Sequence, residues 1–114
     1  MKTYQGSCHC GNVKFQVKTE ISFSTRCDCS ICRRRGGVIL RCDEKDLKIL
    51  SGNETLNLYQ FDSKEAEHYF CKCCGIHTFY RLKMLPNKFG INSGCLDEID
   101  LTSLTPVLTK GSER

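Results

Sequence analysis

The sequence predicts a mainly β domain with antiparallel strands and little helix, held together by bound metal. Three observations predict this. Apolar and polar residues alternate in several short segments, no segment keeps a helical period over about ten residues, and eight of the ten cysteines fall into three tight clusters. Alternation with a period of two is typical of half-buried strands, whereas closely spaced thiols are typical of metal ligands.

The expected strands are separated by turns rich in Gly, Pro, Asn and Ser. In chain order they cover residues 13–17, 38–40, 56–61, 66–71, 76–82 and 88–92. Residues 43–50 are expected to form a short strand or a turn, and residues 51–54 a turn. The strands at 66–71 and 76–82 flank the third cysteine cluster, as two strands meeting at a knuckle would. Residues 110–114 are expected to be frayed.

The chain of 114 residues has the size of one domain, expected over residues 3–110. It contains no Trp and few aromatic residues, so its core is thin, and such cores usually need metal or cross-links. The N-terminus lacks the apolar run of a signal peptide, and no stretch approaches the roughly 20 apolar residues of a membrane span. We therefore expect a cytoplasmic protein with no membrane partner, in which metal ligation is favoured over disulfides.

The first and third cysteine clusters together predict a closed four-thiolate zinc site. In a strand, Cys8 and Cys10 would point to the same face and His9 would point away. In the third cluster a tight turn would bring Cys71 and Cys74 together, with Gly75 free to adopt a positive φ. Cys73 could replace Cys74, but Cys74 has the better turn geometry.

The second cluster, Cys27-x-Cys29-x-x-Cys32, supplies three ligands and no obvious fourth. Either the site is structural and is completed by Cys42, Cys95 or a histidine, or it is an open zinc site with a vacant corner. Three thiolates make zinc electron-rich, which suits the binding of a substrate thiolate better than the acidification of water. We therefore favour a sulfur-bearing small molecule as the ligand of an open site.

The other polar candidates lie close to these clusters. Arg33 and Arg34 could hold a substrate carboxylate, or the arginine run 33–35 could compensate thiolate charge or face solvent. His68 and His77 could relay protons but are more often packed strand residues. Cys42 is most simply a core thiol, and Cys95 is the more plausible extra ligand.

The formal net charge of +4 is weak evidence for a nucleic-acid partner. Seven ionised thiols and two divalent zinc ions would change it by minus seven and plus four, leaving +1. The oligomeric state is not indicated by any pattern in the sequence.

Four segments of the chain resemble a known family. They read GSCHCGNVKF at residues 6–15, CDCSICRR at 27–34, FCKCCGIHTFY at 70–80 and NSGCLD at 92–97. In this order and register they resemble the glutathione-dependent formaldehyde-activating enzyme family, whose domain is shared with centromere protein V. The resemblance covers nearly the whole chain. The enzymes for which the family is named are longer, so the resemblance extends to the fold and metal ligands more than to the substrate contacts.

The resemblance implies an antiparallel zinc-binding fold of the β-tent type. It also implies one structural zinc on Cys8, Cys10, Cys71 and Cys74, and a second zinc on Cys27, Cys29 and Cys32. The implied reaction adds the thiol of glutathione to formaldehyde, which is a carbon–sulfur lyase reaction run in reverse.

Two functions are therefore expected, in order of preference. In the first, the chain is a zinc-dependent carbon–sulfur lyase-like enzyme in which Cys27, Cys29 and Cys32 hold the catalytic zinc and Arg33 or Arg34 binds a substrate carboxylate. In the second, both zinc sites are structural and the arginines contact a protein or nucleic acid. Few aromatic residues are interleaved with basic ones, as base stacking requires, so nucleic acid is the less favoured partner.

Overall fold

The computed structural model describes residues 1–113, which form ten strands, one α-helix and five short 3₁₀ turns. The strands are β1 (Lys2–Ser7), β2 (Lys14–Thr19), β3 (Ser24–Cys27), β4 (Ile39–Asp43), β5 (Leu47–Ser51), β6 (Leu56–Tyr59), β7 (Glu67–Cys71), β8 (His77–Arg81), β9 (Lys88–Asn92) and β10 (Val107–Thr109). The helix α1 covers Ser30–Arg35, and the 3₁₀ turns are Glu44–Asp46, Asn53–Thr55, Ser93–Cys95, Leu101–Ser103 and Gly111–Glu113. The prediction of a mainly β fold with little helix is confirmed.

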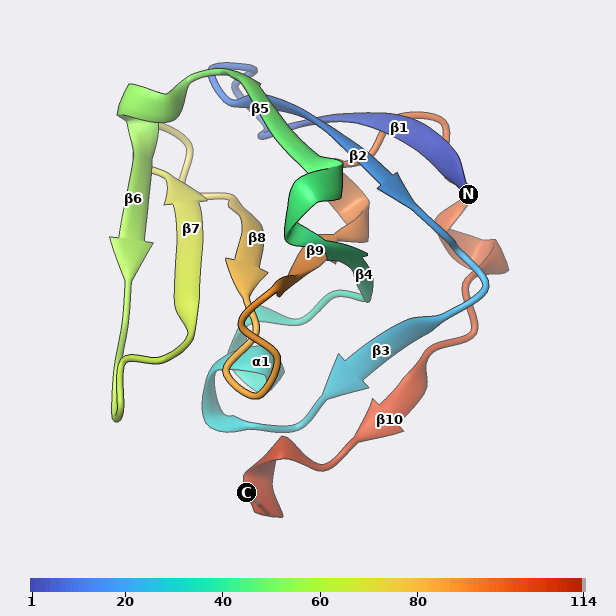
Figure 1. Ribbon diagram of the computed structural model, residues 1–114, viewed down its shortest axis with the longest axis vertical. Helices are drawn as coiled ribbons and strands as arrows, with labels where there is room; N and C mark the ends of the chain where they lie inside the picture. The colour runs from blue at the N-terminus through green and yellow to red at the C-terminus, as the bar shows by residue number, and fades with distance from the viewer. Residues whose placement is uncertain (114) are drawn as a thin grey trace.

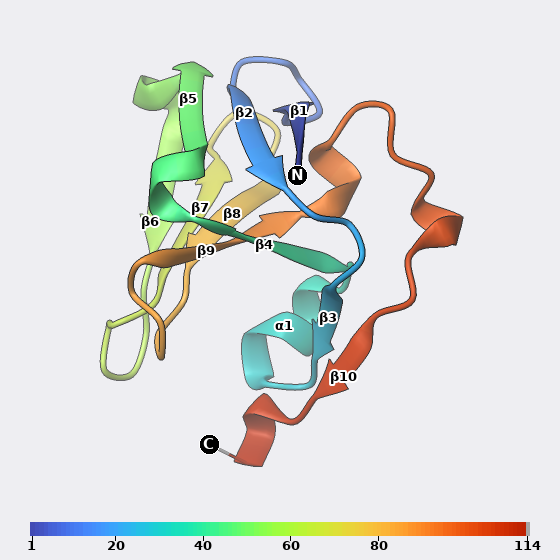
Figure 2. The ribbon, with the colours of Figure 1, turned by 45° about the vertical axis from the view of Figure 1, so that its right-hand side comes forward.

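The strands form two sheets. A three-stranded sheet has the order β1-β2-β5, and a seven-stranded sheet has the order β10-β3-β4-β9-β8-β7-β6. Every strand pair is antiparallel except β10 with β3, which run parallel. In Figure 1 the small sheet lies across the top of the molecule, and β3, β10 and α1 lie at the bottom. The same arrangement, turned, places β10 alongside β3 in Figure 2.

Each of the six expected strands is present, shifted by a few residues at most. The segment 43–50 contains both of its alternatives, because the 3₁₀ turn Glu44–Asp46 leads directly into β5. Three strands lie outside the expected ranges, namely β1, β3 and β10. They are short or polar, and their pairing partners, rather than an internal pattern, make them strands.

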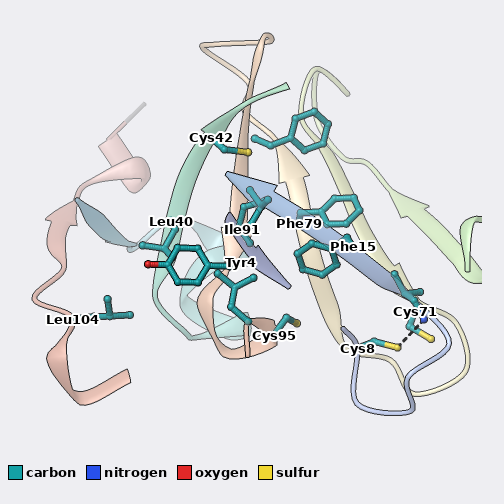
Figure 3. Close-up of a cluster of buried hydrophobic side chains, with 14 residues drawn as sticks. Tyr4, Cys8, Phe15, Leu40, Cys42, Cys71, Phe79, Ile91, Cys95 and Leu104 are labelled. Atoms are coloured by element: carbon teal, nitrogen blue, oxygen red, sulfur yellow. Dashed lines mark hydrogen bonds between the residues drawn. The ribbon is translucent and has the colours of Figure 1, made fainter. Parts of the chain in front are cut away.

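The core lies between the two sheets, and the apolar face of β2 together with the preceding Val13 contributes to it. Val13, Phe15 and Val17 are fully buried, as the alternation predicts. The ring of Phe15 meets that of Phe79 edge to face, with 5.3 Å between the centroids. Figure 3 shows these two rings at the centre of the cluster, with Cys8 and Cys71 near one end. Burying a side chain such as Phe15 stabilises the fold by about 1.5–3 kcal/mol.

The expectation that residues 110–114 are frayed is wrong for Lys110–Glu113, and Arg114 lies outside the described residues. The backbone N–H of Ser112 donates a hydrogen bond to Asp28 Oδ1 (3.0 Å), and that of Asp28 donates to the carbonyl of Thr109 (3.1 Å). The end of the chain is therefore fixed against the loop that carries the second cysteine cluster. None of the helices in residues 1–113 has both the length and the apolar character needed to cross a membrane.

Candidate metal centres

The first cysteine pair lies in the loop between β1 and β2. The backbone N–H of Cys8 donates to the carbonyl of Val13 (3.1 Å), and that of Gly11 donates to the carbonyl of Cys8 (3.2 Å). The pair is therefore held by a turn, and the expectation of an extended strand across Cys8 and Cys10 is wrong. Because the chain reverses here, hydrogen bonds of the turn rather than strand alternation bring the two sulfurs together. His9 is exposed, as expected.

The second pair of this centre lies in the turn between β7 and β8. The backbone N–H of Gly75 donates to the carbonyl of Cys71 (2.7 Å), and Gly75 has a φ of +78°. A residue with a Cβ is strained at such a φ, so the glycine is what allows the turn to be this tight. Cys74 is turned toward the first pair, whereas Cys73 is exposed and is not part of the group.

The four sulfurs have the spacing of a tetrahedral zinc site. The Sγ atoms of Cys8, Cys10, Cys71 and Cys74 all lie within 4.8 Å of one another. Cys10 Sγ lies 3.6 Å from Cys8 Sγ and 3.7 Å from Cys71 Sγ. A tetrahedron with Zn–S bonds of about 2.3 Å has S···S edges of about 3.8 Å. The donor set therefore fits a structural zinc ion.

The ionisation of these thiols also favours a bound cation. Backbone N–H groups of Cys10 and Ile76 lower the pKa of Cys74 to about 6. The N–H of Asn12 lowers the pKa of Cys10, but desolvation and the three neighbouring thiols outweigh it and raise that pKa to about 12. Four adjacent thiolates repel one another, so a divalent ion is needed to stabilise all of them in the charged form.

The middle cluster lies where β3 leads into α1. Cys27 ends β3, Cys29 is the residue before α1, and Cys32 lies within the helix. Their Sγ atoms lie within 4.8 Å of one another, and no further Cys, His, Asp or Glu in residues 1–113 joins the group. The backbone N–H of Cys29 donates to Cys27 Sγ at 3.4 Å. The arrangement presents three thiol donors to one ion, which leaves one corner of a tetrahedron without a protein ligand.

Neither extra cysteine completes this site. Cys42 and Cys95 are both buried in the hydrophobic core, and Cys95 Sγ contacts the carbonyl oxygen of His77 at 3.6 Å. Burial raises the pKa of each of these thiols to about 12. The prediction of Cys42 as a core thiol is confirmed, and the suggestion of Cys95 as an extra ligand is wrong.

Arg35 is the arginine that turns inward, although the sequence did not distinguish it within the run 33–35 that could compensate thiolate charge. Its Nη2 donates to Cys32 Sγ at 3.4 Å, and its Nη1 lies 3.0 Å from His68 Nδ1. The guanidinium carbon lies 4.9 Å from the centroid of the Tyr80 ring, in cation–π geometry. A positive charge therefore stands next to the middle cluster on its protein side. The helical spacing from Cys32 to Arg35 was the available signal, because residues three apart share a helix face.

Arg33 and Arg34 face outward, unlike Arg35. Both are exposed and line a cleft of about 520 Å³. The same cleft is lined by the three cysteines of the middle cluster and by residues of the β6–β7 and β8–β9 loops, among them Phe61 and Met84. The middle cluster therefore opens on a cavity of the size that holds a small molecule.

His68 and His77 are packed together against the ring of Tyr80. The centroid of Tyr80 lies 5.2 Å from that of His68 and 5.7 Å from that of His77. Burial, with a smaller contribution from the positive charge of Arg35, lowers the pKa of His68 to about 4 and that of His77 to about 3. His68 Nε2 and both ring nitrogens of His77 are buried without a hydrogen-bond partner among the described residues. Both imidazoles are therefore neutral near pH 7, and each is a weaker base than an exposed imidazole.

The chain is similar to a known protein family in sequence and to a solved structure in fold. Residues 3–110 match a family model described as glutathione-dependent formaldehyde-activating enzyme. A Halomonas elongata protein, provisionally described as a glutathione-dependent formaldehyde-activating enzyme, is 34% identical over 79 residues, which are 61% of this chain and 50% of that protein. The match thus spans only half the length of this curated relative. A crystal structure of a Rhodobacter sphaeroides protein has a TM-score of 0.87 and 37% identity, covering 92% of this chain and 98% of that one.

Proposed function

This chain belongs to the glutathione-dependent formaldehyde-activating enzyme family, and on that premise we propose that it is a zinc-dependent enzyme joining a small thiol to formaldehyde. The observation that carries the proposal is the three-thiol cluster that opens on a cleft without a fourth protein ligand in residues 1–113. A closed site would hold the fold, whereas an open one leaves room for a substrate sulfur. Ten free thiols suit the reducing conditions of the cytoplasm, which is the location we propose.

The proposed reaction forms one carbon–sulfur bond and involves no oxidant or reductant. The sulfur of the thiol attacks the carbon of formaldehyde, and the electron pair of the C=O π bond moves to oxygen. The proton lost from the thiol is returned, through solvent, to that oxygen. The product is an S-hydroxymethyl thioether, so the enzyme acts as a carbon–sulfur lyase in the direction of synthesis.

Cys27, Cys29 and Cys32 would hold the zinc of this site. Bound there, zinc supplies a Lewis acid that keeps a substrate thiol in its thiolate form near neutral pH. The remaining steps depend on what the chain itself places around the cleft.

Arg33 and Arg34 are the proposed contacts for a carboxylate of the thiol substrate. Both side chains are exposed on α1, directly after the last cysteine of the cluster, and both line the cleft. A guanidinium binds a carboxylate through two parallel hydrogen bonds, which fixes the orientation of the ligand. A glutathione-like thiol, with two carboxylates, fits this pair.

Arg35 is proposed to compensate the charge of the cluster. Three thiolates around a divalent ion leave one negative charge, and a substrate thiolate would add a second. The guanidinium that contacts Cys32 Sγ offsets this charge from the protein side. Because burial lowers the pKa of His68 to about 4 and that of His77 to about 3, both rings are weak bases, and we assign the proton transfer to water in the cleft rather than to either imidazole.

The experiment that tests the proposal measures zinc content and adduct formation together. Purified protein with a known zinc content is mixed with ¹³C-formaldehyde and a thiol, and the rate of S-hydroxymethyl formation is followed by NMR. Glutathione, cysteine and 2-mercaptoethanol are compared, each against the spontaneous reaction without protein. Two zinc ions per chain and a rate above background for the carboxylated thiols are expected. A single tightly held zinc, or rates equal to background for every thiol, would refute the proposal.

A further inference from the structure

The last described residues of the chain run beside the middle cysteine cluster. Strand β10 pairs in parallel with β3 and places Thr109 opposite Cys27. Beyond it, the 3₁₀ turn Gly111–Glu113 continues past the loop that leads into α1. Figure 2 shows β10 and the C-terminal turn below β3 and α1. The C-terminal segment, about eighty residues away in sequence, therefore lies against the loop that carries the middle cysteine cluster.

Two hydrogen bonds clasp this segment onto the cluster. Asp28, which lies between two of the candidate ligands, donates its backbone N–H to the carbonyl of Thr109 (3.1 Å) and accepts the N–H of Ser112 on Oδ1 (3.0 Å). The clasp thus engages both the backbone and the side chain of Asp28. These two hydrogen bonds hold the backbone between Cys27 and Cys29 in place through residues of the C-terminal segment.

Gly111 lies at the point of closest approach. A Cβ built on Gly111 would overlap Cys27 Sγ and would lie 2.9 Å from the Cβ of Cys29. The φ of this glycine is one that other residues adopt, so close packing against the sulfur, and not backbone conformation, is what requires glycine here. Thr109, Gly111 and Ser112 also line the cleft on which the cluster opens.

We propose that residues 109–112 are part of the second metal site, and that Gly111 is a positioning residue that fixes the sulfur of Cys27 for the ion. The proposal rests on the three-thiolate zinc of the proposed function. The family match ends at residue 110, so Gly111 and Ser112 lie outside the part of the chain that the match describes. Groups around metal ligands commonly fix their orientation, and their loss weakens metal binding about 10- to 100-fold.

The test compares Gly111→Ala with Gly94→Ala in the full chain. Gly94 is a matched control because its added Cβ would approach nothing closer than 3.4 Å, the Oδ1 of Asn92. The zinc-free proteins are titrated with Co²⁺, whose visible absorption reports each tetrahedral thiolate site. Gly111→Ala is expected to weaken the second Co²⁺ equivalent about 10- to 100-fold while the first is unchanged. Gly94→Ala is expected to bind both equivalents as the wild type does.

A second variant covers the case in which Gly111→Ala does not fold. Asp28→Ala adds no bulk and removes the acceptor for Ser112, so it is expected to weaken the second equivalent as well, by a smaller factor. If Gly111→Ala, or Asp28→Ala when the former is unfolded, binds both equivalents with wild-type affinity and spectrum, the proposed role of residues 109–112 is overturned. If the wild type itself binds only one equivalent, the three-thiolate site fails, which is a different result.

Discussion

The guanidinium of Arg35 donates a hydrogen bond to Cys32 Sγ over 3.4 Å, from one helical turn further along α1. The same guanidinium reaches His68, so a buried imidazole, a cation and a sulfur of the middle cluster form a continuous chain of contacts. The middle cluster thus has a positively charged protein side and an open cleft side.

Replacing Arg35 is expected to weaken the middle site. Arg35→Met keeps much of the side-chain length but removes the charge beside Cys32, and the second zinc equivalent should bind about 10- to 100-fold more weakly. Arg35→Lys keeps the charge but lacks the planar guanidinium, so its zinc affinity at the middle site should lie between those of the wild type and Arg35→Met. Competition with a zinc chelator measures both values. Arg34→Met serves as the control, since Arg34 donates a hydrogen bond to the carbonyl of Ser30 and to no cysteine sulfur within residues 1–113; an equal loss in that variant would contradict the role of Arg35.

The two centres should respond differently to the loss of one sulfur. Cys29→Ser is expected to lose one zinc ion and the thiol-addition activity while the domain stays folded. Cys74→Ser should unfold or be strongly destabilised, because structural zinc contributes on the order of 10 kcal/mol to small domains. Zinc content, circular dichroism and thermal unfolding distinguish the two variants. Indistinguishable behaviour of the variants would remove the division into a structural and a catalytic centre.

Arg33 and Arg34 should affect only substrates that carry a carboxylate. Replacing either arginine by Ala removes a bidentate partner, and a charge-assisted hydrogen bond contributes roughly 1.5–3 kcal/mol. We therefore expect KM for glutathione to rise roughly tenfold or more with kcat little changed. The KM for uncharged 2-mercaptoethanol should stay the same in each variant. An equal rise for both thiols would show that the arginines support the fold or the metal, and not the carboxylate.

His68 and His77 should remain neutral well into the acidic range. Burial lowers the pKa of His68 to about 4 and that of His77 to about 3. Below a pH of about 6.5 the unfolded chain gains protons on these rings while the folded chain does not, so stability falls as the pH falls toward 4. NMR titration of the ring signals tests this directly. Titration of His68 near pH 6.5 in the folded protein would contradict the buried arrangement.

The sequence was sufficient to predict most of the strands and both cysteine groups. Alternation located β2, and the glycine after Cys74 predicted the turn that places this sulfur, since φ is positive at Gly75. These features depend on residues close together in the chain, so their pattern is local. The choice of Cys74 over Cys73 followed from the same local geometry, and the structure groups Cys74 with the first pair.

The features that the sequence did not predict depend on distant contacts. Nothing in residues 107–112 indicates a strand and a turn, because β10 is defined by its pairing with β3 and Gly111 by its packing on Cys27. Likewise, the run of three arginines indicates which one faces inward only if the segment is known to be helical, and the six residues of α1 are too few to show a helical period. The inward orientation of Arg35 depends on the short helix α1, which places this side chain on the same side as Cys32 and in contact with His68.

The centre formed by the first and third clusters also has a topological consequence. Cys10 and Cys71 are 61 positions apart, so an ion bound to them would act as a cross-link around a large loop, and the middle cluster lies within that loop. Such a cross-link reduces the conformational entropy of the unfolded chain between the two cysteines. The entropic cost of closing this loop grows only slowly with the number of residues in it. Loss of zinc from the four-thiol centre would then open this cross-link and release the enclosed chain, the middle cluster included, to proteases and misfolding.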